Sequence, residues 1–322
     1  MIWNVFTLLI GFVLLIKSSE VMIDNAPKIA TMLRVSPFII GFSVVAFGTS
    51  APELIIGIIT GVSKTNQLTM GNVLGCVLTN GALVIGIAAI FKTISIDKAV
   101  IYREIPLSAG VLGLFMLLLF LGGMLSRIDG LILLVCFVGF LVYLLTRSKG
   151  SFTHDEEIAH GVDKEEAAGD QKQKHKILPF IYLVLSIAGV IIGGNFVVQG
   201  STEIARFFGL SEFLIGVTIV SVGTSLPELV STLIAMKKNR SDIAIGNIIG
   251  SNIFNILFVL GVSAAIHPIG MMKGIQWDFL LAFVPILLLF FLSLRKKELK
   301  RYGGVILFAY YILYILWKVL SI

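Results

Sequence analysis

The sequence has few charged residues: Asp, Glu, Lys and Arg make up only 14% of its 322 residues. Soluble domains average about a quarter. Hydrophobic residues make up 57%, and the mean hydropathy is +0.99. These values exclude an ordinary soluble globular protein. They also argue against a transmembrane β-barrel, whose short segments alternate apolar and polar residues.

The sequence has only two cysteines, Cys76 and Cys136, and both lie within apolar stretches. We therefore expect no disulfide framework and interpret both as reduced thiols. The net charge is +6, but the basic residues lie in loops rather than on one face, which argues against nucleic-acid binding. The apolar stretches contain no His and no nucleophile–base pair, so we predict neither an enzyme nor a bound cofactor.

Ten apolar stretches are each long enough to cross a membrane as a helix, which takes about 20 residues. They predict an all-α polytopic membrane protein with five helices in residues 1–146, a charged linker at 147–176 and five more helices in residues 177–322. The predicted spans are 3–20, 38–62, 68–91, 104–122, 127–146, 177–200, 211–235, 241–264, 276–293 and 303–320.

The distribution of basic residues predicts the orientation. Of the 25 Lys and Arg residues, 20 lie on the side of the predicted membrane that holds the linker. Because basic loops stay in the cytoplasm, we predict a cytoplasmic linker and two outside termini. Five helices per half is an odd number, so two similar halves would lie in the membrane with inverted topology.

An internal repeat is present at an offset of 175 residues. Residues 36–80 align without a gap to residues 211–255, with 16 identities in 45 positions. Inverted repeats with interrupted helices are typical of secondary transporters. The polar and helix-breaking matches are Gly48, Thr49, Ser50, Pro52, Glu53, Gly71, Asn72, Gly75 and Asn80, which align with Gly223, Thr224, Ser225, Pro227, Glu228, Gly246, Asn247, Gly250 and Asn255.

Each repeat places one carboxylate, Glu53 or Glu228, near the middle of a predicted span. Such a carboxylate costs at least ~2.5 kcal/mol on insertion scales, and no Lys or Arg lies near the middle of a span to pair with it. The hydroxyls of Thr49 and Ser50 are expected on the same helix face as Glu53. Thr224 and Ser225 repeat this arrangement beside Glu228.

A proline directly precedes each carboxylate. Pro52 and Pro227 lack the N–H that would bond the carbonyls of Gly48 and Gly223, so the helix should open there. Backbone carbonyls freed in this way are tolerated in a membrane where they face a cavity.

The following span of each repeat adds further polar groups: Cys76 and Asn80 in the first copy, Ser251 and Asn255 in the second. Carboxylate, hydroxyl, amide and carbonyl oxygens are hard ligands that suit Ca²⁺ and Na⁺ rather than zinc or copper. Two carboxylates neutralise one divalent ion or two monovalent ions. If Ca²⁺ and Na⁺ cannot occupy the site at the same time, the movement of one ion is coupled to the movement of the other.

The motifs GTSAPEL…GNVLGCVLTN and GTSLPEL…GNIIGSNIFN resemble the two α-repeats of the sodium/calcium exchanger family, in the cation/calcium antiporter superfamily, and its prokaryotic members in particular. The resemblance implies ten helices in a plasma membrane, a first and a sixth helix that slide past the core, and inward Na⁺ flow that drives Ca²⁺ out. It implies Ca²⁺ ligands at Thr49, Glu53, Thr224 and Glu228. It implies Na⁺ sites at Ser50, Ser225 and Ser251 and the carbonyls of Ala46 and Ser221, with Asn80 and Asn255 lining the centre.

Two residues depart from the family pattern. Cys76 stands where the first repeat usually has Ser, and because sulfur is a poor Na⁺ ligand, the number of Na⁺ ions stays open. Asn255 stands where potassium-dependent relatives have Asp, which predicts transport without K⁺. H⁺ as the counter-ion remains an alternative, since a desolvated carboxylate can also carry a proton. A monomer in the lipid bilayer should suffice, because both halves build one site.

Overall fold

The structure is a computed structural model that describes residues 2–65, 67–148, 174–209, 221–271 and 274–320. Most of the predicted linker and the beginning of the predicted span 211–235 therefore lie outside the described residues. The first half comprises α1 (Ile2–Leu33), α2 (Pro37–Ile40), η1 (Gly41–Val45), α3 (Ala46–Thr49), α4 (Ala51–Val62), α5 (Gln67–Leu78), η2 (Thr79–Val84), α6 (Ile85–Phe91), β1 (Ile94–Ser95), η3 (Val100–Glu104), α7 (Ile105–Gly122), β2 (Met124–Leu125) and α8 (Arg127–Ser148). The second half comprises α10 (Lys174–Phe207), α12 (Ser221–Thr224), α13 (Leu226–Lys237), α14 (Ser241–Phe254), η6 (Asn255–Val259), α15 (Leu260–Ile266), β3 (Ile269–Gly270), α16 (Ile275–Leu294), β4 (Glu298–Leu299) and α17 (Arg301–Leu320). The η segments are π-helical turns.

Seven helices in the described part of the chain are long and apolar enough to cross a membrane, and the bent pair Pro37–Thr49 and Ala51–Val62 raises the number to eight. The chain is therefore a multi-pass helical membrane protein. The two other expected spans are α17, a 20-residue helix that does not meet the same criterion, and 211–235, which is described only in part. Ten spans and the inverted topology of the halves stay predictions.

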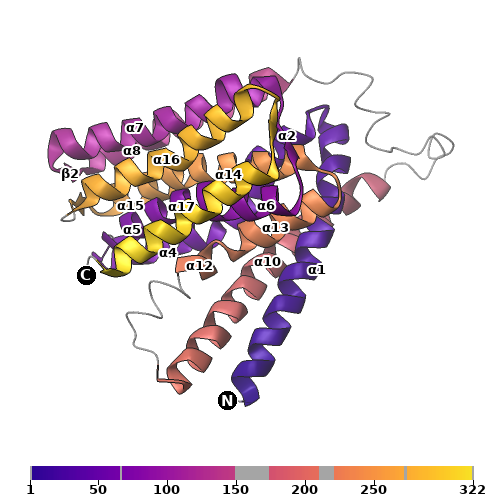
Figure 1. Cartoon of the computed structure of the whole chain (residues 1–322), viewed down its shortest axis with the longest axis horizontal. Helices are drawn as coiled ribbons and strands as arrows, with labels where there is room; N and C mark the ends of the chain where they lie inside the picture. The colour runs from indigo at the N-terminus through magenta and orange to yellow at the C-terminus, as the bar shows by residue number, and fades with distance from the viewer. Residues whose placement is uncertain (1, 66, 149–173, 210–220, 272–273, 321–322) are drawn as a thin grey trace.

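α1 and α10 pack side by side along their length and extend away from the other helices (Figure 1). α1 continues to Leu33, well beyond the predicted end at residue 20, because its polar residues Ser18, Ser19 and Asn25 are buried in contacts. Glycines allow the close approach: a Cβ on Gly193 would lie 2.6 Å from the backbone nitrogen of Leu15. The two helices are antiparallel.

Two helical segments form the centre of the protein. In the apolar windows of Leu68–Phe91 and Ser241–Ile266, 83% and 94% of the residues are buried, compared with a third or less in the other long helices. These two segments contain the second parts of the two sequence repeats. The second part of each sequence repeat therefore lies in the core of the protein.

Elements at corresponding places in the two halves make matching contacts. α8 packs on α15, and α17 packs on α6. β1 pairs with β4 and β2 pairs with β3, both antiparallel. Each helix contact is made through glycines: a Cβ on Gly304 would lie 2.7 Å from the carbonyl oxygen of Gly86, and one on Gly130 would lie 2.8 Å from that of Gly261.

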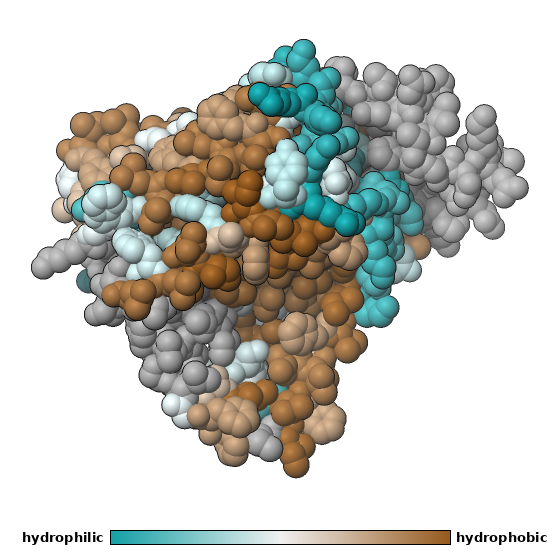
Figure 2. All heavy atoms as spheres, in the orientation of Figure 1, coloured by the Kyte–Doolittle hydropathy of each residue, from teal (hydrophilic) through white to brown (hydrophobic). Residues whose placement is uncertain are grey.

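The surface of the molecule is mainly apolar on the face drawn in Figure 2, where hydrophilic residues gather at one end. The segment that joins α16 to α17 lies at that end and carries the exposed residues Arg295, Lys296 and Lys297. An apolar surface with polar residues at the ends of the helices is expected for a protein surrounded by lipid.

Candidate ion-binding site

Two equivalent helix breaks position the two carboxylates. The backbone leaves helical geometry at Ser50, with φ −91° and ψ 9°, and again at Ser225, with φ −92° and ψ 5°. A proline in the first turn of the following helix accounts for both breaks, since it cannot continue the hydrogen-bond pattern of the preceding turn. The first break bends its span by 47°.

Glu53 and Glu228 lie in the first turns of α4 and α13. Backbone N–H groups and the positive end of the helix dipole face outward at a helix N-terminus, and both stabilise a nearby negative charge. Both side chains are buried, with 0% and 1% of their surface exposed, and their charges repel each other. The helix breaks therefore hold two carboxylates near each other inside the protein.

The two asparagines, Asn80 and Asn255, also occupy equivalent places. Each lies in a π-helical segment, η2 or η6, that follows the glycine-containing helix of its repeat. Such segments are rare and frequently occur at functional sites. Both side chains are buried, with at most 1% of their surface exposed.

The hydroxyls of the first repeat point to the second repeat. Ser50 donates a hydrogen bond to Oε1 of Glu228 at 2.9 Å, whereas the sequence placed this hydroxyl beside Glu53 of its own helix. The Oγ1 of Thr49 lies 3.1 Å from Oδ1 of Asn247 and 3.4 Å from Oγ of Ser251. The break at Ser50 explains the difference, because the two sides of a bent helix no longer share one face.

The threonine of the second repeat contacts the first repeat in a similar way. Thr224 Oγ1 lies 3.5 Å from Oδ1 of Asn72 and 3.8 Å from the sulfur of Cys76. Cys76 donates to Oε1 of Glu53 at 3.6 Å. Thus each half of the site combines a threonine from one repeat with an amide and a thiol or hydroxyl from the other.

The backbone carbonyls of Ala46 and Ser221, both predicted as ligands, differ in the hydrogen bonds around them. The carbonyl oxygen of Ala46 accepts from the backbone N–H of Ser50 at 3.0 Å and from the hydroxyls of Thr49 at 3.3 Å and Ser251 at 3.5 Å. In the second repeat the N–H of Ser225 donates instead to the carbonyl of Val222, at 3.1 Å. Ser221 is the first residue of α12.

Several buried oxygens at this site have no hydrogen-bond donor among the described residues. They are Glu53 Oε2, Glu228 Oε2, Asn80 Oδ1, Asn255 Oδ1 and Ser225 Oγ. Within the described ranges neither carboxylate forms a salt bridge. A buried charge without a partner is costly, and a bound cation removes that cost. The oxygen set therefore fits Ca²⁺ or Na⁺.

Soft or histidine-containing metal sites do not fit this arrangement. The described residues include no group of three or more His, Cys, Asp or Glu side chains that could hold a metal. The candidate site instead combines two carboxylates with neutral oxygens. Which oxygen binds which ion stays a prediction.

Sequence reasoning missed the part played by two more asparagines. Asn72 and Asn247 were recognised as repeat matches, but the structure places their amide oxygens against Thr224 and Thr49. Asn252 was also missed: its Oδ1 accepts from the amide of Asn80 at 3.2 Å. The conserved spacing of Asn72 and Asn247 within the repeat was the signal that could have identified the first two.

Close helix packing keeps the second repeat in place. A Cβ on Gly250 would lie 2.2 Å from the carbonyl oxygen of Phe42, and one on Gly246 would lie 2.6 Å from that of Phe38. For the equivalent Gly71 and Gly75 no described atom lies within 4 Å of such a Cβ, and the counterparts of Phe38 and Phe42 in the second repeat lie outside the described residues. Residues 210–220, which precede the second break, lie outside the described residues.

Comparison with known proteins gives a consistent result. The sequence matches the family described as "Sodium/calcium exchanger protein" over residues 3–146 and 178–320. A "Putative antiporter CaxA" from Alkalimonas amylolytica is 38% identical over 300 residues, which cover 92% of each chain. The "Sodium/calcium exchanger MaX1" of Methanosarcina acetivorans is 29% identical over 346 residues, which cover 97% of each chain.

The fold also matches a solved structure. The sodium-calcium exchanger NCX_Mj, soaked with 2.5 mM Na⁺ and 0.1 mM Ca²⁺, superposes with a TM-score of 0.81 at 28% sequence identity, and the match covers 98% of each chain. The family match includes both halves and is interrupted only around the linker. This chain therefore belongs to the sodium/calcium exchanger protein family, a family of cation antiporters in the membrane.

Proposed function

We propose that this protein exchanges Na⁺ for Ca²⁺ across the membrane by alternating access, extrudes Ca²⁺ and does not require K⁺. The observation that supports this most directly is the pair of buried carboxylates, Glu53 and Glu228. They come from equivalent helix breaks, have no basic partner among the described residues and each keep one oxygen without a donor. Family membership supports the same conclusion.

In this proposal Ca²⁺ is bound by Thr49, Glu53, Thr224 and Glu228. Na⁺ binds in flanking sites built from Ser50, Ser225, Ser251 and the carbonyls of Ala46 and Ser221, with Cys76 beside one of them. The two carboxylates carry two negative charges, which one Ca²⁺ or two Na⁺ neutralise. A site that is empty and doubly charged would be costly to enclose in the membrane, so switching without ions is suppressed.

Alternating access would require one part of the protein to move past the other. α1 and α10 are suited to this role because they pack mainly on each other and extend from the remaining helices (Figure 1). α1 also contacts the site-bearing helix α13, where the hydroxyls of Ser19 and Ser231 lie 3.2 Å apart. Movement of this pair would expose the site to one side at a time.

The first experiment measures ⁴⁵Ca²⁺ uptake into proteoliposomes loaded with Na⁺. The control liposomes contain choline and have an imposed pH gradient. Na⁺/Ca²⁺ exchange requires uptake that follows the Na⁺ gradient and is insensitive to a protonophore. Uptake that needs only the pH gradient would identify H⁺ as the counter-ion, which would replace Na⁺ in this proposal and leave the paired glutamates as the Ca²⁺ site.

A further inference from the structure

The two halves have equivalent side-chain clusters beside their helix breaks. Gly130 of α8 and Gly304 of α17 make equivalent glycine contacts with the core, and they are 174 residues apart in the sequence. The strands β2 and β4, which directly precede these helices, are related by the same offset. Under this correspondence the counterpart of Phe137 in α8 is Tyr311 in α17.

The cluster beside the first break is entirely aromatic. Phe254 packs against Phe47 of α3 and against Phe137, with ring centroids 5.1 Å and 5.7 Å apart. Phe258 of η6 lies 4.8 Å from Phe137 and 5.1 Å from Phe254. These ring contacts join α3, which precedes the break, to the π-helical segment η6.

The cluster beside the second break has smaller side chains and two hydroxyls. The residues at the positions of Phe47, Phe254 and Phe258 are Val222, Thr79 and Leu83. Leu83 and Val222 pack in one apolar cluster with Tyr311. The ring of Tyr311 therefore lies between α12, which precedes the second break, and η2, which carries Asn80.

The hydroxyl of Tyr311 is a buried polar group. Only 4% of the residue is exposed, and its oxygen makes no hydrogen bond of normal geometry with a described residue. Thr79 lies close enough to interact with this hydroxyl, and Cys76, one helical turn before Thr79, lies within electrostatic range. A buried hydroxyl without a partner costs free energy, so its presence at this place requires an explanation.

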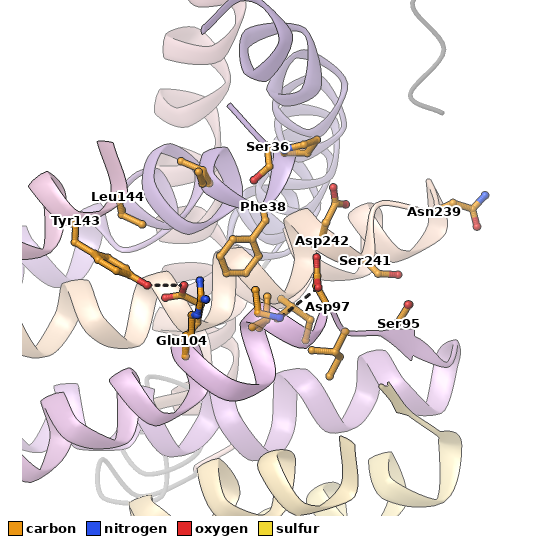
Figure 3. A pocket seen from close by; sticks show the side chains of 17 residues that line it. Ser36, Phe38, Ser95, Asp97, Glu104, Tyr143, Leu144, Asn239, Ser241 and Asp242 are labelled. Atoms are coloured by element: carbon orange, nitrogen blue, oxygen red, sulfur yellow. Dashed lines mark hydrogen bonds between the residues drawn. The ribbon is translucent and has the colours of Figure 1, made fainter. Parts of the chain in front are cut away.

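Two other tyrosines on the equivalent helices have hydrogen-bond acceptors. Tyr143 of α8, which lines a polar cavity and an apolar groove between α7 and α8, donates to Oε1 of Glu104 at 3.1 Å (Figure 3). Tyr310 of α17 donates to the carbonyl of Leu281 at 2.7 Å. These acceptors lie on η3 and α16, which carry none of the candidate ligands. Tyr311 instead faces α5 and η2, which carry two of them.

We propose that Tyr311 is a positioning residue for Na⁺ binding, which acts through Thr79 on Cys76 and Asn80. Thr79 is the first residue of the π-helical segment η2 and directly precedes Asn80. A hydrogen bond between the hydroxyls of Tyr311 and Thr79 would fix this turn, and with it the amide and the thiol on the side of the site that lacks a serine. This proposal rests on the proposed exchange of Na⁺ for Ca²⁺.

The equivalent cluster indicates the variant that tests this role. Phe137 shows that a phenylalanine ring fits the corresponding place on α8, so Tyr311→Phe removes the hydroxyl and keeps the ring. Removing a buried hydroxyl without a partner should leave the thermal midpoint equal to or above that of the wild type. A role in packing alone predicts a lower midpoint.

The experiment measures equilibrium binding of ⁴⁵Ca²⁺ to the purified full-length protein in detergent and its displacement by Na⁺. For Tyr311→Phe we expect the Na⁺ concentration at half-displacement to rise about fivefold, as for one lost hydrogen bond. Affinity for Ca²⁺ without Na⁺ should change by less than about twofold, because the carboxylates are retained. Thr79→Val should have the same effect, and the double variant should add nothing further.

Tyr310→Phe is the matched control, because it removes a neighbouring hydroxyl of α17 whose acceptor is on α16. It should lower the thermal midpoint and leave displacement by Na⁺ unchanged. Displacement of the wild-type kind in Tyr311→Phe would overturn the proposal, and so would a lower midpoint with equal losses of Na⁺ and Ca²⁺ affinity. Additive effects of Tyr311→Phe and Thr79→Val would overturn the action through Thr79.

Na⁺-driven ⁴⁵Ca²⁺ uptake into proteoliposomes gives a second measurement. Tyr311→Phe should raise the half-saturating Na⁺ concentration and keep the maximal rate, whereas a misfolded fraction would lower the maximal rate alone. The wild type tests the exchange proposal separately. If the wild type binds Ca²⁺ that Na⁺ does not displace, exchange and this role of Tyr311 both fail; if only the variants behave like the wild type, exchange stands and the positioning role fails.

Discussion

The two halves of the candidate site have the same plan but different contacts. At Glu228 the partner is an oxygen, the hydroxyl of Ser50 at 2.9 Å. At Glu53 the partner is the sulfur of Cys76 at 3.6 Å, and the hydroxyl of Ser225 has no hydrogen bond of normal geometry within the described part of the chain. The duplicated sequence therefore provides two equivalent positions for a carboxylate, and one substitution makes their surroundings unequal.

This difference separates two properties of the site. Charge depends on the two glutamates, which are present in both halves, so the capacity to balance one Ca²⁺ does not require symmetry. Affinity for Na⁺ depends on the number of hard oxygens in each flanking site, and a thiol reduces that number on one side. We therefore expect substitutions of the glutamates to stop transport and substitutions of their neighbours to adjust it.

The largest effect should come from removing either carboxylate. Glu53→Gln and Glu228→Gln each leave one negative charge, which cannot balance Ca²⁺, so Na⁺-driven ⁴⁵Ca²⁺ uptake should fall to background. Glu203→Gln is the control, because Glu203 is half exposed and, among the described residues, pairs with Arg206 on the surface. Uptake at the wild-type rate in either site variant would contradict the site assignment.

Gly250 and Gly113 should differ in their tolerance of a methyl group. Gly250→Ala places a Cβ 2.2 Å from the carbonyl of Phe42, and such overpacking costs about 1–3 kcal/mol of stability. It should also displace Ser251 from Thr49 and lower uptake. Gly113→Ala is the control, because the nearest described atom to its Cβ would be the ring carbon Cζ of Phe283 at 3.9 Å, an ordinary van der Waals contact, and it should be milder.

Thermal unfolding of the two purified variants in the same detergent measures this difference. We expect a lower midpoint for Gly250→Ala than for Gly113→Ala. If both variants unfold at the temperature of the wild type, the close contact between α14 and η1 does not contribute to stability as inferred.

Cys76→Ser should make the two halves more alike. A hydroxyl in place of the thiol adds a hard oxygen beside Glu53, and we expect the half-saturating Na⁺ concentration to fall by about fivefold, as for a contact of ~1 kcal/mol. Ser251→Cys introduces the thiol on the other side and should raise that concentration. Uptake as a function of Na⁺ concentration measures both effects.

Cys136→Ser is the control for these variants, because Cys136 lies on α8 away from the glutamates. It should leave the Na⁺ dependence unchanged. An unchanged Na⁺ dependence in Cys76→Ser as well would show that position 76 does not contribute to Na⁺ binding.

The smallest expected effect concerns K⁺. Because Asn80 and Asn255 are both amides, the centre of the site has no third negative charge for K⁺ to balance. Replacing external choline by K⁺ at fixed Na⁺ and Ca²⁺ should leave the uptake rate unchanged. Stimulation by K⁺ in the wild type would contradict this prediction, and Asn255→Asp tests whether an added carboxylate creates it.

Much of the site could be anticipated from the sequence because its residues recur at one offset. Polar residues inside apolar stretches are few, so the duplicated Glu53 and Glu228 were recognisable, together with the prolines that break their helices. The breaks at Ser50 and Ser225 occur where those prolines require them. Local chemistry was sufficient for these features.

Contacts between the halves could not be anticipated in the same way. The sequence placed Ser50 beside Glu53, but the structure directs its hydroxyl to Glu228. The roles of Asn72 and Asn247 were missed for the same reason, since their partners are threonines from the opposite repeat. A helical face describes neighbours along one helix and contains no information about a second helix that crosses it.

The sequence by itself determined that this is a multi-pass helical membrane protein of the exchanger family, because hydropathy and a duplicated motif are properties of the chain alone. Only the tertiary structure decided which hydroxyl faces which carboxylate. It also decided that α1 extends as far as Leu33 and that α7 and α8 leave a groove at Gly110 and Gly139. Those features depend on how closely helices far apart in the chain approach each other. That distance is set by side chains on both partners.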